Sequence, residues 1–92
     1  MRPVIQTPAF RRDLKSWLKS HPNTSAAILA VLEQLAIDPS IPALHTHKLK
    51  GKLAGYWACS VGYDLRIVFD YASLNGAEAI VLHALGSHDD VY

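Results

Sequence analysis

Apolar residues recur at two different spacings along the chain, and the spacing changes near its middle. Between residues 8 and 37 they recur every three or four positions and form two stripes, which contain Phe10, Leu14, Trp17 and Leu18, then Ile28, Val31, Leu32 and Leu35. This spacing predicts two amphipathic helices. Because only a few residues around His21 and Pro22 separate them, we expect the helices to pack as an antiparallel hairpin.

A short segment precedes the first helix. Residues 2–6 predict a strand that ends at Thr7 and Pro8. Threonine is a favourable N-cap, and proline fits the first helical position because its missing N–H is not needed there. After the second helix, residues 39–44 predict a loop.

From residue 47 onward the apolar positions alternate with polar ones. The alternation, together with β-branched and aromatic residues, predicts strands over residues 47–53, 55–61, 65–71 and 77–85. Turn signals occupy residues 62–64 and 74–76, and Asn75-Gly76 is a favoured hairpin turn. The element order predicts an α+β domain over residues 1–92, in which a short N-terminal strand and a helical hairpin pack on one face of a small twisted antiparallel sheet.

Strand alternation also assigns side chains to the two faces of this sheet. In residues 65–71 the apolar positions share one face, which places Asp64 and Arg66 as neighbours on the other, open face. In residues 47–53, Leu49 and Leu53 are expected to face the core while the lysines at 48, 50 and 52 point outward. Three outward lysines are most often a solvated surface.

Composition and charge fit one folded domain of 92 residues, half of them hydrophobic and 18% charged. A net charge of +1 argues against binding nucleic acid by bulk electrostatics, although two lysine- and arginine-rich segments allow a local basic face. The N-terminus has no apolar stretch of secretory length, and no membrane span is expected. With the single cysteine, Cys59, expected in the core, the chain is predicted to be cytoplasmic.

Five histidines are the first candidates for chemistry. His21 at a helix end and His83 within an apolar strand are expected to be structural. The other three, His45, His47 and His88, lie near the ends of predicted strands. The chain has no cysteine cluster or recognisable ligand spacing, so neither a metal site nor a cofactor is expected.

Two segments carry a family resemblance. The segment HKLKGKLAGYWACSVGYDLRIVFDY, residues 47–71, and the terminal GSHDDVY, residues 86–92, resemble the RelE/ParE superfamily of toxins of type II toxin-antitoxin systems, most closely the YafQ branch. The H-x-L-x-G, G-Y, D-x-R-I-x-F and terminal G-S-H-D-x-x-Y motifs occur together and in order, which is more specific than any one of them.

The resemblance implies a RelE-like fold and an endoribonuclease that cleaves messenger RNA in the ribosomal A site without a metal ion. It also implies a cognate antitoxin that holds the toxin inactive. The usual antitoxin is a ribbon-helix-helix DNA-binding dimer, so operator DNA would be reached only through it. Cleavage through the RNA 2′-hydroxyl requires a base, a cation for the charge on phosphorus and an acid for the departing 5′-oxygen.

The resemblance places catalytic residues at His47, Asp64, His88 and Tyr92. By chemical role, we expect His47 and His88 to transfer protons, Asp64 to orient them or act as base, Tyr92 to stack on a base, and Arg66 to stabilise the phosphate. Four further residues are expected to contact RNA, namely Lys48, Lys50, Tyr56 and Ser87.

The chain also departs from the family pattern at three positions. Ser60 stands where related toxins carry histidine, Leu65 where they carry tryptophan, and Ala84 where they carry arginine. Two alternatives therefore stay open, a ParE-like toxin that inhibits gyrase through protein contacts, and a catalytically inactive module that binds an antitoxin.

Overall fold

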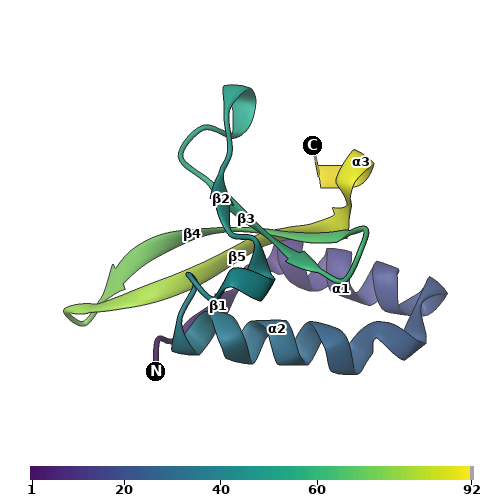
Figure 1. The fold of residues 1–92 in the computed structure, drawn as a ribbon, viewed down its shortest axis with the longest axis horizontal. Helices are drawn as coiled ribbons and strands as arrows, with labels where there is room; N and C mark the ends of the chain where they lie inside the picture. The colour runs from purple at the N-terminus through teal and green to yellow at the C-terminus, as the bar shows by residue number, and fades with distance from the viewer. Residues whose placement is uncertain (92) are drawn as a thin grey trace.

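A helical hairpin covers one face of a five-stranded mixed sheet in the computed structural model, which describes residues 1–91 apart from the side chain of Asp90 (Figure 1). The sheet order is β1-β5-β4-β3-β2. The elements are β1 (Val4–Gln6), α1 (Pro8–Ser20), α2 (Ser25–Ile37), β2 (His47–Lys48), β3 (Trp57–Val61), β4 (Leu65–Leu74), β5 (Ala77–Ser87) and α3 (His88–Val91). Three short 3₁₀ helices connect them, η1 (Pro22–Thr24), η2 (Pro42–Leu44) and η3 (Gly51–Leu53).

The predicted α+β class and helical hairpin are confirmed, with one difference in the sheet. Strands β2 to β5 pair antiparallel, whereas β1 runs parallel to β5. A parallel neighbour needs a long connection, and here the two helices and the other strands supply it. The predicted hairpin turn is confirmed, since Asn75 and Gly76 join β4 to β5 with φ values of 52° and 80°. Two successive positive φ angles are the geometry that Asn-Gly favours.

The start of α1 is held by Thr7, as the sequence predicts. Its side-chain oxygen accepts a hydrogen bond from the Phe10 N–H at 3.2 Å and donates one to the Leu82 carbonyl at 2.7 Å. The same hydroxyl therefore caps the helix and ties it to β5. Pro8 occupies the first helical position.

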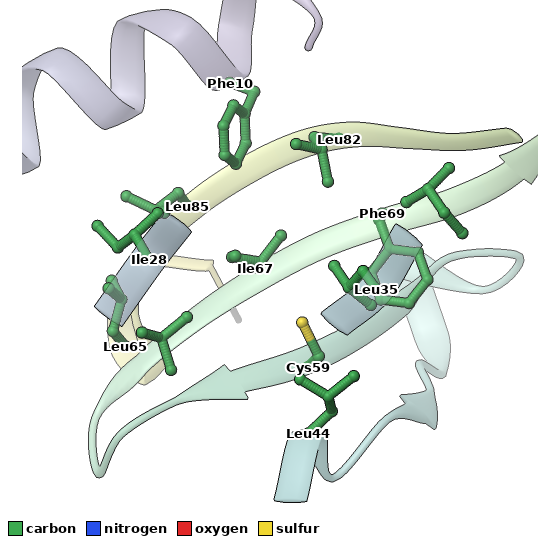
Figure 2. Packing of buried hydrophobic residues seen from close by; sticks show 12 residues of the cluster. Phe10, Ile28, Leu35, Leu44, Cys59, Leu65, Ile67, Phe69, Leu82 and Leu85 are labelled. Atoms are coloured by element: carbon green, nitrogen blue, oxygen red, sulfur yellow. The ribbon is translucent and has the colours of Figure 1, made fainter. Parts of the chain in front are cut away.

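The core lies between the hairpin and the sheet. Phe10 reaches from α1 towards Leu82 and Leu85 of β5, while Ile67 and Phe69 of β4 form the centre of the cluster (Figure 2). Phe10, Ile67, Phe69 and Leu82 are all fully buried. Burial of this kind is the main favourable contribution to folding and fixes which face of each strand turns away from the helices.

The predicted strand over residues 47–53 is wrong beyond its first two residues. The chain leaves the sheet after Lys48, turns through η3 with Gly51 at φ +67°, and returns to the sheet at Trp57. Hydrogen bonds from Leu49 N to Tyr56 O and from Tyr56 N to Leu53 O, both of 3.0 Å, close this loop. Leu49 and Leu53 are consequently only half-buried, and the three lysines do not share one strand face. Lys48 stays in β2 and pairs with Trp57, whose ring packs against the core, while Lys50 and Lys52 lie in the segment that leaves the sheet.

Strand β5 contains an irregularity at His83. Val68 pairs with Ala84, but the next residue of β4, Phe69, pairs with Leu82, which leaves His83 as an extra residue. Such β-bulges redirect side chains and are frequent beside functional sites.

The sheet face opposite the helices is bordered by two projections. Figure 1 shows the β2–η3 segment and α3 rising from that face, while α1 and α2 lie on the other side. We call this surface the open face because α1 and α2 do not cover it. No helix among residues 1–91 is long and apolar enough to cross a membrane.

Candidate functional site

Residues that pair with one another across neighbouring strands form two rows on the open face. One row contains Ser60, Arg66 and Gly86, and the parallel row contains His47, Ala58, Val68 and Ala84. Rows two residues apart along the strands are separated by about 7 Å, and neighbouring strands by about 4.8 Å. Except for Arg66 and His47, the side chains in both rows are small or medium-sized and uncharged, so the guanidinium is the dominant charge in the middle of the face.

Arg66 is held at the start of β4. Its Nη1 donates hydrogen bonds of 3.1 Å to the carbonyl oxygens of Tyr63 and Leu65. These bonds use one of the guanidinium nitrogens, and carbonyl partners leave its positive charge unneutralised. The side chain is half-buried, so its charge acts in an environment that screens it less than bulk water does.

His47 and Lys48 both belong to the edge strand β2, but as consecutive residues they point to opposite faces: His47 towards the open face and Lys48 towards the side of Trp57. The Nδ1 of His47 lies 2.9 Å from the His45 carbonyl, so a neutral ring carries its proton on Nδ1 and its lone pair on Nε2. The Lys48 ammonium lies 5.4 Å from the centre of the Trp57 ring, within range of a cation–π contact. Lys50 is exposed in the loop that follows.

The C-terminal candidates lie at the end of β5 and directly after it. Ser87 pairs with Leu65 as the last residue of β5, and His88 begins α3. The His88 Nδ1 lies 3.8 Å from the Asp89 carboxylate, with the imidazole 58% exposed. Tyr92, the last predicted site residue, lies outside the described residues.

Asp64 does not lie beside Arg66 as expected. It belongs to the turn between β3 and β4 and lines a pocket of about 360 Å³ whose opposite wall includes Trp17, His21 and Thr24 of the helical hairpin. No ion pair joins Asp64 to Arg66 in the part of the chain that the structure describes. The alternation that predicted this pair holds only within a strand, and the strand begins at Leu65.

The structure adds a cluster around His83, a residue that was expected to be structural. His83, at the bulge, places Nε2 at 2.9 Å from the Asp70 carboxylate, and the edge of the Tyr56 ring meets the imidazole with centroids 5.0 Å apart. Tyr56 was expected to contact RNA, but neither His83 nor Asp70 was a candidate. A single sequence carries no signal for the bulge that brings these two together.

Cys59 is a core residue, as predicted. Burial raises the pKa of its thiol to about 12, an effect only partly opposed by the charge of Arg66. A thiol that stays protonated near neutral pH is neither a nucleophile nor a good metal ligand. Among the described residues, no three His, Cys, Asp or Glu side chains gather closely enough to hold a metal ion.

Comparison with protein families gives one match that spans almost the whole chain. Residues 2–92 match the family described as a bacterial toxin of type II toxin-antitoxin system, YafQ. No curated protein sequence is significantly similar to the chain.

Solved structures share the fold. A metal-bound toxin from Helicobacter pylori is similar with a TM-score of 0.80 and 27% identity, and the alignment covers 100% of both chains. YafQ from Escherichia coli strain BL21(DE3) aligns over 100% of this chain and 99% of its own, with a TM-score of 0.74 and 19% identity. The E. coli DinJ-YafQ toxin-antitoxin complex gives a TM-score of 0.69 and 21% identity, covering 99% of this chain and 97% of the matched chain.

Proposed function

The chain belongs to the YafQ family of bacterial toxins of type II toxin-antitoxin systems, and we propose that it is a ribosome-dependent endoribonuclease that cleaves messenger RNA. In this proposal the RNA 2′-hydroxyl attacks the adjacent phosphorus and the bond to the 5′-oxygen breaks, without a metal ion. The toxin would act in the cytoplasm, where translating ribosomes present the message.

The position of Arg66 carries the proposal. Its paired neighbours are Gly86, which has no side chain, and Ser60, which has a short one, so a phosphodiester can approach the guanidinium from the open face. The negative charge on phosphorus increases in the transition state, and a fixed cation that is partly shielded from water stabilises this charge most.

Histidines at the two ends of the face support proton transfer. His47 arrives from β2 and His88 from the start of α3, and histidine can donate or accept a proton near neutral pH. Asp64 then acts from the β3–β4 turn, as an orienting group or an alternative base. Tyr92 is proposed to stack on a nucleobase.

The remaining candidates would hold the RNA. Lys50 is exposed in the β2–η3 segment, and Lys48 reaches over Trp57 at the edge of the sheet. Both are proposed to contact phosphates of messenger or ribosomal RNA. Tyr56 and Ser87 lie nearer the sheet, at the start of β3 and the end of β5, and each has a hydroxyl able to hydrogen-bond the substrate.

An antitoxin is the proposed protein partner. The fold similarity to the toxin of the DinJ-YafQ complex supports such a partner for this chain. We propose that it is of the ribbon-helix-helix type and that operator DNA is bound only through it.

Induction of the toxin in a bacterial host tests the proposal. Mapping of transcript 5′ ends should show cuts at in-frame positions of translated messages, and the cuts should disappear in His88→Ala and Arg66→Ala strains. Arg12→Ala is the control, because Arg12 is an exposed residue of α1, a helix on the other side of the sheet from the open face. A DNA-damage response without transcript cuts would indicate gyrase inhibition instead, and growth without any defect would indicate an inactive antitoxin-binding module.

A further inference from the structure

His83 and Asp70 form an imidazole–carboxylate pair on the sheet, and this pair has no role in the chemistry described above. The distance of 2.9 Å between His83 Nε2 and Asp70 Oδ1 is that of a charge-assisted hydrogen bond. Both side chains are about one-third exposed, at 32% and 35%, so the pair is neither sealed in the core nor fully solvated.

The bulge in β5 gives His83 its position. Leu82 on one side and Leu85 on the other both turn into the core, and the extra residue allows His83 to join Ala84 on the opposite surface. Asp70 lies two residues beyond Val68 on β4 and therefore shares its face. The pair thus stands on the open face, in the rows next to the one that contains His47.

Asp70 and Tyr56 together fix the imidazole. Because a carboxylate accepts hydrogen bonds and does not donate them, the Nε2 of His83 carries a proton and a neutral ring has its lone pair on Nδ1. The Tyr56 ring meets the imidazole at an angle of 73°, which limits rotation about the side-chain bonds. A carboxylate that fixes the tautomer of a partly exposed histidine is the arrangement by which a proton acceptor is prepared in hydrolytic triads.

We propose that His83 is the general base of RNA cleavage on this face and that Asp70 is the residue that positions it. The Nδ1 of His83 takes the proton of the 2′-hydroxyl as the 2′-oxygen forms its bond to phosphorus. The bond from phosphorus to the 5′-oxygen breaks, that oxygen takes a proton from His88 or His47, and the other product ends in a 2′,3′-cyclic phosphate. This inference rests on the proposed ribonuclease function and assigns its base.

Single-turnover cleavage of ribosome-bound messenger RNA tests the assignment. Loss of a general base lowers the rate by about 10²- to 10⁴-fold, and we expect this fall in His83→Ala. Added imidazole should restore part of the rate in His83→Ala, because the truncated site is reachable from solvent, but should not affect Asp70→Asn, which keeps its own imidazole. The control is again Arg12→Ala, which should cleave like the wild type.

A second substrate separates the base from the acid. When sulfur replaces the 5′-oxygen, the leaving group needs no proton, so the defect of an acid variant shrinks while that of a base variant persists. We expect the His83→Ala defect to persist on this substrate. Relief of the defect would assign His83 as the acid and overturn the proposal, and so would a wild-type rate in His83→Ala or a defect that imidazole does not restore.

The failure of this inference is distinguishable from the failure of the proposed function. A wild-type protein that leaves ribosome-bound messages intact contradicts the ribonuclease function itself. A wild-type protein that cleaves, with an equally active His83→Ala variant, contradicts only the role of His83. Thermal unfolding of each variant shows whether a lost rate reflects lost folding, and a His83→Gln variant that melts like the wild type provides the comparison if His83→Ala is unstable.

Discussion

Asp64 and Arg66 are separated by one residue, yet their side chains border different parts of the surface. Arg66 bonds to carbonyl oxygens at the start of β4 and lies in a row on the open face, whereas Asp64 lines the pocket that faces the helical hairpin. The sequence suggested that Asp64 and Arg66 act as one pair, but Asp64 belongs to the β3–β4 turn and Arg66 to β4. Their contributions to cleavage should therefore be separable by mutation.

Replacement of Arg66 by alanine should lower single-turnover cleavage by about 10²- to 10³-fold, the usual cost of removing one group that stabilises transition-state charge. Arg66→Lys should recover part of this loss because lysine keeps the positive charge. The recovery should be incomplete because lysine lacks the planar, forked guanidinium group. Stability should change little, since the hydrogen bonds of Arg66 go to carbonyls near the surface. Arg12→Ala, which removes an exposed arginine from α1, is the control. An Arg66→Ala variant as active as wild type would remove the guanidinium from the mechanism.

Replacement of Asp64 by asparagine should lower the single-turnover rate less than Arg66→Ala does. We expect the Asp64→Asn variant to remain faster than Arg66→Ala by about tenfold or more. Among the described residues the carboxylate has no ion pair with Arg66 to lose, and asparagine keeps one oxygen that can accept a hydrogen bond. The same ribosome-bound substrate measures both variants. If Asp64→Asn were as slow as Arg66→Ala, the turn would have to bring its carboxylate onto the reacting atoms in the bound state.

Much of this fold could be predicted from local signals, and the errors have local causes. The helix start at Thr7-Pro8 and the hairpin turn at Asn75-Gly76 depend only on residues close by in the sequence, and both predictions are confirmed. The alternation in residues 47–53 imitates a strand, but Gly51 takes a positive φ and the chain leaves the sheet. A positive φ is available to glycine in any context, so the sequence alone does not reveal where it is used.

The functional surface was harder to predict because it depends on register. The period-2 pattern of residues 77–85 reads as a regular strand, and the extra residue at His83 appears only once β5 is paired with β4. Likewise, the parallel contact of β1 with β5 joins residues 76 positions apart, as Val4 and Ile80 show. Pairing partners at such separation leave no trace in local propensity.

Removal of transition metals should not reduce cleavage, because the proposed mechanism uses only imidazole, guanidinium and carboxylate groups. The measurement is single-turnover cleavage with and without a chelator that binds zinc and copper but leaves ribosomal magnesium in place. The rate should stay within the error of the untreated sample. A loss of cleavage that zinc or copper restores would contradict the metal-free mechanism.

Replacement of Thr7 by alanine should lower the free energy of unfolding by about 1–2 kcal/mol, because the N-cap and the link to β5 depend on the same hydroxyl. Urea unfolding followed by circular dichroism measures the change. Thr7→Ser keeps the hydroxyl and should remain within about 0.5 kcal/mol of wild type. Equal losses in both variants would show that the methyl group, and not the hydrogen bonds, stabilises this junction.

Stability at alkaline pH should depend on Cys59. Burial raises the pKa of this thiol from 9.0 to about 12, so the unfolded chain loses the proton at a lower pH than the folded chain does. Its contribution to stability is therefore fully present below pH 9.0 and is lost as the pH rises towards about 12, by up to about 1.4 kcal/mol per pH unit.

Cys59→Ala removes this titration but keeps the tyrosines and lysines that also ionise in this range. Urea unfolding between these limits should therefore show a smaller decline for Cys59→Ala than for wild type. Parallel declines would mean that the thiol reaches water in the folded protein and that the core around Ile67 and Phe69 is more open than its complete burial indicates.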